Sequence, residues 1–177
     1  GMVLNISPLG ARAERPRPVF LLVHGAWHGG WCWRRVAERL EAAGARVLTP
    51  TLTGCGERSH LMGPGIGLDT HIADIVAVIE AEEASGVHLC GHSYGGMVIT
   101  GVCDRLKDRI ASALYLDAAV PMDGQSMITQ SPGITPGAAA ATEMGLRALA
   151  PDSVAMQVFA DVTIFGIAPG GDDEAWL

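Results

Sequence analysis

The stretch Val87–Leu106 constrains the fold of this chain more than any other. It opens with the apolar run Val87-His88-Leu89-Cys90, passes directly into Gly91-His92-Ser93-Tyr94-Gly95, and then places apolar residues at helical spacing as far as Leu106. A short apolar run bounded by glycine is typical of a buried strand, and spacing of three and four residues is typical of a helix. Because the helical pattern begins at Tyr94, only a sharp turn can join the two. The sequence therefore predicts a strand, a glycine-flanked turn and a helix in immediate succession.

Strands and helices alternate over the rest of the chain up to residue 120. Further strands are predicted at Val19–Val23, Arg46–Leu48 and Ala113–Leu116, each a short and mainly apolar run. Helices are predicted from Trp31 to Glu41, with Trp33, Val36, Ala37 and Leu40 facing inward, and from a cap at Asp69 or Thr70 as far as Gly86. The glycine-rich segment 51–67 predicts a long loop. This alternation predicts an α/β fold with a parallel, doubly wound sheet and right-handed crossovers.

Composition divides the chain into three parts. Residues 1–18 form an N-terminal arm, since the prolines at its end exclude a helix. Residues 19–120 hold the strand and helix pattern and form the core. Residues 121–177 are rich in glycine, proline, serine and alanine and are predicted to be a helical lid segment. Its candidate elements are short helices at Ala138–Leu149 and Ser153–Phe159 and a short strand at 162–165, with Met127 and Met144 assigned to lid core.

Bulk composition excludes several functional classes. The net charge is −7 and the 12 basic residues are scattered, which argues against binding of nucleic acid or of an anionic membrane surface. No apolar run approaches the ~20 residues that a transmembrane helix needs, and the N-terminus lacks the pattern of a signal peptide. The four cysteines have neither metal-site nor disulfide-framework spacing, so we expect reduced thiols in a cytoplasmic protein. We expect no metal site and no cofactor.

Ser93 is the candidate nucleophile. The pattern Gly-x-Ser-x-Gly between a strand and a helix lifts a serine hydroxyl above the sheet, at the positive end of the helix that follows. Gly91 and Gly95 supply the small neighbours that so tight a turn requires. The competing interpretation is an ordinary helix cap, since serine is a favoured cap residue.

A second glycine-rich loop, His24–Gly30, follows the strand 19–23. In a doubly wound sheet this strand is the neighbour of 87–90, so the loops after both strands meet at the carboxyl edge, where such sheets bind ligands. Acyl transfer needs backbone N–H donors for the developing oxyanion. The predicted donors are the N–H groups of Ala26 and Tyr94, and the residues predicted to line the substrate pocket are Gly25, Trp27, His28 and Asp117.

The two loops together resemble those of one family. The run His24-Gly25-Ala26-Trp27-His28-Gly29-Gly30-Trp31-Cys32-Trp33, with Gly91–Gly96, resembles the plant-type esterase and hydroxynitrile lyase branch of the α/β-hydrolases. The resemblance runs from Val19 to the C-terminus, and Leu116–Ser126 resembles the segment leading into that branch's lid. It implies a reduced α/β-hydrolase fold of about four parallel strands in the order 46–48, 19–23, 87–90, 113–116. It also implies a small carboxylic ester as substrate. The lyases carry a threonine where this chain has Gly25, which favours the esterase over the cyanohydrin lyase.

The usual catalytic triad cannot be assembled from this sequence. A serine hydrolase of this fold uses a serine, an acid and a histidine in that chain order, whereas all six histidines here precede Ser93. The resemblance implies that the acid and the histidine belong to later strands. We therefore expect the chain to be the front portion of a longer hydrolase, with weak or absent activity. Among the substitutes, Asp117 is assigned a structural role, His92 is expected to point away from the pocket, and His24 and His28 are expected to hydrogen-bond the loop backbone.

An incomplete hydrolase core has two further implications. The alternative to an esterase is a non-catalytic remnant that binds a small apolar ligand or a protein partner. The strand 113–116 is expected to be an exposed, apolar sheet edge, so we expect a homodimer or larger assembly that buries it.

Overall fold

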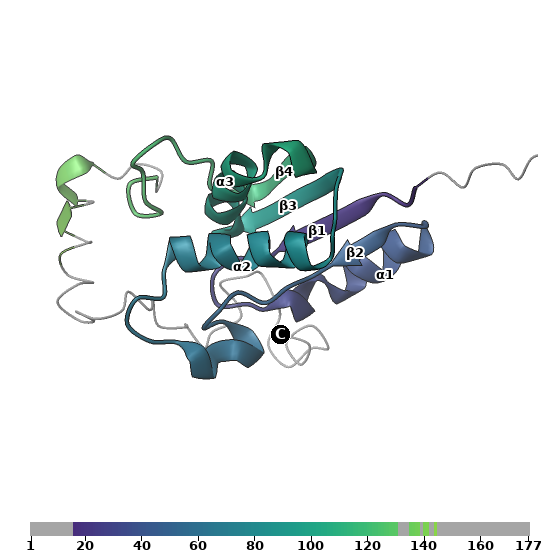
Figure 1. Ribbon diagram of the computed structural model, residues 1–177. Coiled ribbons are helices and arrows are strands. Elements are labelled where there is room, and N and C mark those ends of the chain that lie inside the picture. The colour runs from purple at the N-terminus through teal and green to yellow at the C-terminus, as the bar shows by residue number, and fades with distance from the viewer. Residues whose placement is uncertain (1–15, 131–134, 139, 142–143, 145–177) are drawn as a thin grey trace, which may run out of the picture.

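The computed structural model describes residues 16–130, 135–138, 140–141 and 144. At its centre is a four-stranded parallel sheet in the order β2-β1-β3-β4 (Figure 1). The strands are β1 (Val19–Val23), β2 (Arg46–Leu48), β3 (Val87–Ser93) and β4 (Ile110–Ala118). The predicted α/β class and strand order are confirmed. Strands β3 and β4 are longer than predicted, since β3 continues into the turn at its carboxyl end and β4 extends beyond the predicted residues at both ends.

Helices cover both faces of the sheet. They are α1 (Arg34–Ala42), α2 (Leu68–Ala81) and α3 (Gly95–Arg105), with short 3₁₀ helices η1 (Gly30–Trp33), η2 (Gly56–Leu61) and η3 (Lys107–Arg109). Successive residues of a strand point to opposite faces. Leu21 of β1 and Leu89 of β3 pack against α2 and α3, whereas Leu22 and Cys90 pack on the other face beside η1 and α1. Most of the core lies between the sheet and α2 and α3, where Ile75, Ile79, Val98, Ile99 and Val102 are fully buried.

The face beside α1 is covered only in part. Helix α1 packs against β2, and Val36, predicted to face inward, is 42% exposed. That prediction was wrong because helical spacing identifies an apolar stripe but not whether a neighbour covers all of it. At the edge of the same face, Leu114 and Leu116 of β4 are 58% and 46% exposed. Among the described strands, β4 pairs only with β3, so the predicted exposed edge is present.

Two local predictions need correction. Helix α2 begins after Gly67 rather than at a cap on Asp69 or Thr70. The Thr70 hydroxyl instead accepts a hydrogen bond from the N–H of Gly67 at 3.2 Å, so it stabilises the helix start from inside the first turn. The segment 51–67 is not wholly loop, since η2 lies within it.

Several predictions fall on parts of the chain that are not described. The arm 1–18 is described only from residue 16, and the lid helix at Ser153–Phe159 and the strand at 162–165 lie outside the described residues. Of the lid helix predicted at Ala138–Leu149, residues 138, 140, 141 and 144 are described and are helical. Within the described ranges, no helix is both long and apolar enough to cross a bilayer. No group of three or more His, Cys, Asp or Glu side chains in those ranges is placed to hold a metal ion.

Candidate active site

Ser93 occupies the sharp turn between β3 and α3. Its backbone has a φ of +53°, in the left-handed region that residues with a side chain rarely adopt. The neighbouring residues must be glycines, because there is no room for a side chain at either position. A Cβ on Gly91 would lie 2.6 Å from the carbonyl oxygen of Gly95, and a Cβ on Gly95 would lie 2.6 Å from that of Val23. The predicted turn and its need for small neighbours are confirmed.

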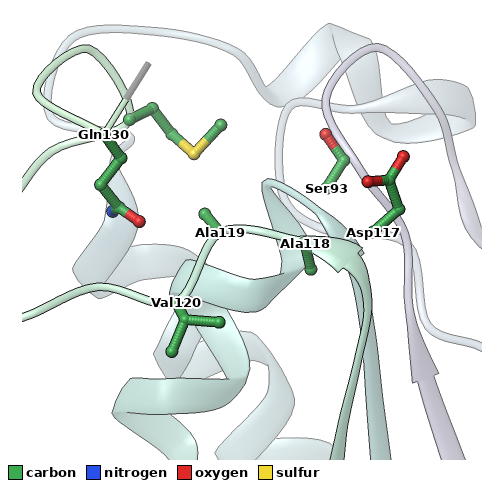
Figure 2. Close-up of a pocket in the computed structure, with 7 residues that line it drawn as sticks. Ser93, Asp117, Ala118, Ala119, Val120 and Gln130 are labelled. Carbon is green, nitrogen blue, oxygen red and sulfur yellow. The ribbon is translucent and has the colours of Figure 1, made fainter. Parts of the chain in front are cut away.

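Asp117 reaches the same site through a β-bulge. In the β3–β4 pairing, His92 lies opposite Leu116 and Ser93 lies opposite Ala118, so Asp117 is an extra residue in β4. Its φ is +42°, also left-handed. The bulge directs the Asp117 carboxylate toward the region of the Ser93 hydroxyl (Figure 2).

A pocket of about 480 Å³ opens beside these two residues. Its lining consists of Ser93, Asp117, Ala118, Ala119, Val120, Met127 and Gln130 (Figure 2). Of the residues predicted to line it, Asp117 does so, whereas Gly25, Trp27 and His28 are not part of this lining. Gly25 lies behind the serine, since a Cβ there would be 3.0 Å from the Cβ of Ser93. Ala118, Ala119, Val120 and Gln130 were not predicted to line a pocket, and Met127 was predicted to be lid core. Ala118, Ala119 and Val120 come shortly after the predicted strand 113–116, which ends at the same edge of the sheet as 87–90. That position was the available signal.

The loop His24–Gly30 is held by its own histidines. The buried His24 ring donates from Nδ1 to the Gly25 carbonyl at 2.7 Å and accepts at Nε2 from the N–H of Leu52 at 3.0 Å. Burial lowers the pKa of His24 to about 4, so the ring stays neutral and Nε2 can accept. His28 Nδ1 donates to the Ala26 carbonyl at 2.8 Å, beside a left-handed turn at Trp27 (φ +65°). The prediction that both histidines bond the loop backbone is confirmed.

The residues directly before and after Ser93, His92 and Tyr94, each contact another aromatic ring. His92 lies edge-on to Trp33, with ring centroids 6.4 Å apart, on the α1 side of the sheet. It therefore points away from the pocket, as predicted. On the other side, the hydroxyl of Tyr94 contacts Nδ1 of His71 at 2.8 Å. His71 was not predicted to matter, because an isolated histidine in an apolar helix carries no signal of its contacts.

The sequence matches that of known proteins across this whole region. The model of the Alpha/beta hydrolase family matches residues 20–177. The chain belongs to the α/β hydrolase family. It is 56% identical, over 126 residues, to the carbendazim hydrolyzing esterase of Nocardioides sp. (strain SG-4G), an alignment that covers 71% of this chain and 52% of that protein. It is 33% identical to Esterase PIR7B of Oryza sativa subsp. japonica over 110 residues, which cover 61% of this chain and 41% of the esterase.

Solved structures agree on this α/β hydrolase fold. An extracellular α/β-hydrolase from a Paenibacillus species superposes with a TM-score of 0.64 at 29% identity, covering 76% of this chain and 53% of the other. The chain thus spans about half the length or less of these relatives. The resemblance to the α/β-hydrolases that the two loop motifs indicated is confirmed.

Proposed function

We propose that this α/β hydrolase chain is a serine ester hydrolase in which Ser93 attacks the carbonyl carbon of a small ester. The observation that carries the proposal is the left-handed turn that presents Ser93 to the pocket at the start of α3. The names of the two relatives, both esterases, support the same class of reaction. In this proposal the N–H groups of Ala26 and Tyr94 donate to the oxyanion as it forms.

The proposed reaction has two covalent steps. In the first, the bond between Ser93 Oγ and the acyl carbon forms, the bond from that carbon to the alkoxy oxygen breaks, and the alcohol leaves with the serine proton. In the second, water cleaves the acyl–Oγ bond to give the carboxylic acid and free Ser93. The lid assignment of residues 121–177 belongs to the same proposal, and it is supported by Met127 and Gln130, which line the same pocket as Ser93.

The pocket supplies little help to either proton transfer. Among the seven described residues that line it, none is a histidine. We therefore expect Ser93 to react with activated acyl and phosphonyl compounds, and turnover of ordinary esters to be weak. The same observation favours the second candidate, a non-catalytic remnant that binds a small apolar ligand against Ala118, Ala119 and Val120.

A fluorophosphonate probe tests the proposal. We expect labelling of the wild-type chain at Ser93, no labelling of Ser93→Ala, and unchanged labelling of Ser85→Ala, an exposed serine before β3. Folded wild-type protein that resists the probe would favour the remnant. Because the Nocardioides relative is named for hydrolysing carbendazim, the first substrate for turnover is carbendazim, followed by chromatography of the products.

The proposal extends to the assembly and the location of the protein. We propose that two copies associate through the outer edge of β4, because Leu114 and Leu116 are exposed there. A cytoplasmic location is proposed from the cysteines, all four of which are free thiols.

A further inference from the structure

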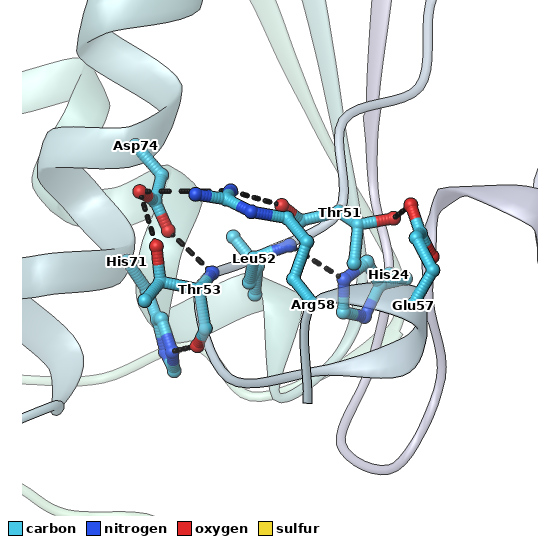
Figure 3. A network of polar contacts seen from close by, with 8 residues as sticks. All are labelled: His24, Thr51, Leu52, Thr53, Glu57, Arg58, His71 and Asp74. Carbon is cyan, nitrogen blue, oxygen red and sulfur yellow. Dashed lines mark hydrogen bonds and ion pairs between the residues drawn. The ribbon is translucent and has the colours of Figure 1, made fainter. Parts of the chain in front are cut away.

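The segment Thr51–Thr53 lies between two histidines, His24 directly after β1 and His71 of α2 (Figure 3). On one side the N–H of Leu52 donates to Nε2 of His24, at 3.0 Å, directly before the loop that holds Ala26. On the other side the carbonyl of Thr53 contacts Nε2 of His71, at 2.9 Å. One short segment therefore contacts both histidines.

Charged side chains fix this segment in place. The Asp74 carboxylate accepts from the N–H of Thr53 at 2.6 Å and from its hydroxyl at 2.8 Å. Arg58 lies 3.9 Å from Asp74 and donates to the Thr51 carbonyl at 2.7 Å, while the Thr51 hydroxyl donates to Glu57 at 2.6 Å (Figure 3). Hydrogen bonds to charged groups are among the stronger ones. These hydrogen bonds hold the segment in one position, and the segment in turn orients the rings of His24 and His71.

The contacts of His71 determine its tautomer. A carbonyl oxygen can only accept, so Nε2 of His71 carries the hydrogen that it donates to Thr53. In the neutral ring Nδ1 is then an acceptor, and its partner, 2.8 Å away, is the hydroxyl of Tyr94. Burial raises the pKa of the Tyr94 hydroxyl, which therefore keeps its hydrogen and donates. The two rings meet edge to face, with centroids 5.6 Å apart and an interplanar angle of 82°.

Tyr94 supplies one of the two proposed oxyanion donors, its backbone N–H. It follows Ser93 directly and is the N-cap of α3, with φ −54° and ψ −30°. Its side chain is held at the far end by a histidine that is itself only 7% exposed. We propose that His71 is a positioning residue for the reaction at Ser93, acting through the Tyr94 hydroxyl to hold the Tyr94 N–H toward the oxyanion. This inference rests on the proposed function, and His71 itself touches no substrate in it.

Two replacements of His71 separate its two contacts. In His71→Gln the amide nitrogen can take the place of Nε2 and keep the Thr53 contact, but the acceptor for Tyr94 is lost. In His71→Asn the amide oxygen can take the place of Nδ1 and keep the Tyr94 contact. We expect His71→Gln to slow fluorophosphonate labelling of Ser93 by about 10-fold, less than the ~10²–10³ that loss of an oxyanion donor costs. His71→Asn should stay within about 3-fold of wild type. Glu80→Ala, at an exposed position of the same helix α2, is the control and should not change the rate.

Coupling to Tyr94 is the second measurement. Tyr94→Phe removes only the hydroxyl and should slow labelling as much as His71→Gln, and the double variant should be no slower than either single one. Additive losses, or equal losses in His71→Gln and His71→Asn, would overturn the positioning role. In ¹⁵N NMR, Tyr94→Phe should shift the His71 Nδ1 resonance, and an unmoved resonance would contradict the contact. A wild-type chain that is not labelled at all would instead overturn the proposed function.

Discussion

Ser93 and Asp117 adopt left-handed backbone conformations at the carboxyl ends of neighbouring parallel strands, with φ of +53° and +42°. Both line the same pocket. Such conformations cost free energy in residues that have a side chain, and they persist where the surrounding structure enforces them. One strained turn is expected at the Gly-x-Ser-x-Gly motif. The second, across from it in β4, shows that the bulge at Asp117 also belongs to the site.

The left-handed turn at Asp117 can be tested through stability. Asparagine tolerates this conformation nearly as well as aspartate, whereas a β-branched residue does not. Asp117→Asn should leave the free energy of unfolding within about 0.5 kcal/mol of wild type, and Asp117→Val should lower it by about 1–3 kcal/mol. Urea denaturation measures both. If valine proved as well tolerated as asparagine, the backbone at 117 could not be left-handed.

Crowding behind Ser93 gives a second prediction. A Cβ on Gly25 would lie 3.0 Å from the Cβ of Ser93 and 3.2 Å from Nδ1 of His92. Gly25→Ala should therefore shift Ser93, slow its labelling by about 10-fold and lower the free energy of unfolding by about 1–3 kcal/mol. The matched control is Gly63→Ala, where a Cβ meets nothing within 4 Å. Equal behaviour of the two variants would mean that Gly25 does not pack against the serine.

The buried His24 makes stability depend on pH. Its pKa is about 4 in the folded chain and 6.5 as its ordinary value, so between these values the unfolded chain binds more protons. This contribution is complete above about pH 6.5 and is lost as the pH falls toward 4. From about pH 7.5 to about pH 5 the loss is on the order of 2 kcal/mol.

The variant His24→Asn isolates that contribution. Asparagine does not titrate, so the free energy of unfolding should fall less steeply with pH in the variant, by about 2 kcal/mol over the same interval. All other titrating groups are common to both proteins. Parallel curves for wild type and variant would show that His24 titrates normally in the folded chain.

The free edge of β4 predicts association. A lysine on an exposed edge strand blocks pairing with another strand. We expect Leu114→Lys to shift the mass measured by light scattering toward the monomer. Val36→Lys, an exposed apolar position on α1, should leave the mass unchanged. A wild-type chain that is monomeric at all accessible concentrations would contradict the proposed dimer.

Local sequence patterns were sufficient for the framework of this protein. Each strand of the parallel sheet is a short, mainly apolar run, and the alternation with helices predicts that the strands are parallel. The turn at Ser93 was also predictable, because only glycine fits at positions 91 and 95 beside it. These features depend on residues that are close together in the sequence, so they can be predicted from local sequence patterns.

Tertiary structure alone decided how the site is built around that framework. The bulge at Asp117 depends on how β4 aligns with β3, and the exposure of Val36 depends on what covers α1. The link from His71 to Tyr94 joins residues 23 apart and exists only because α2 packs beside α3. Hydrogen bonds of this kind are set by distance in space and leave no periodic signal in the sequence. The sequence determined where the turn at Ser93 lies, and the packing of the helices decided which side chains contact the residues around it.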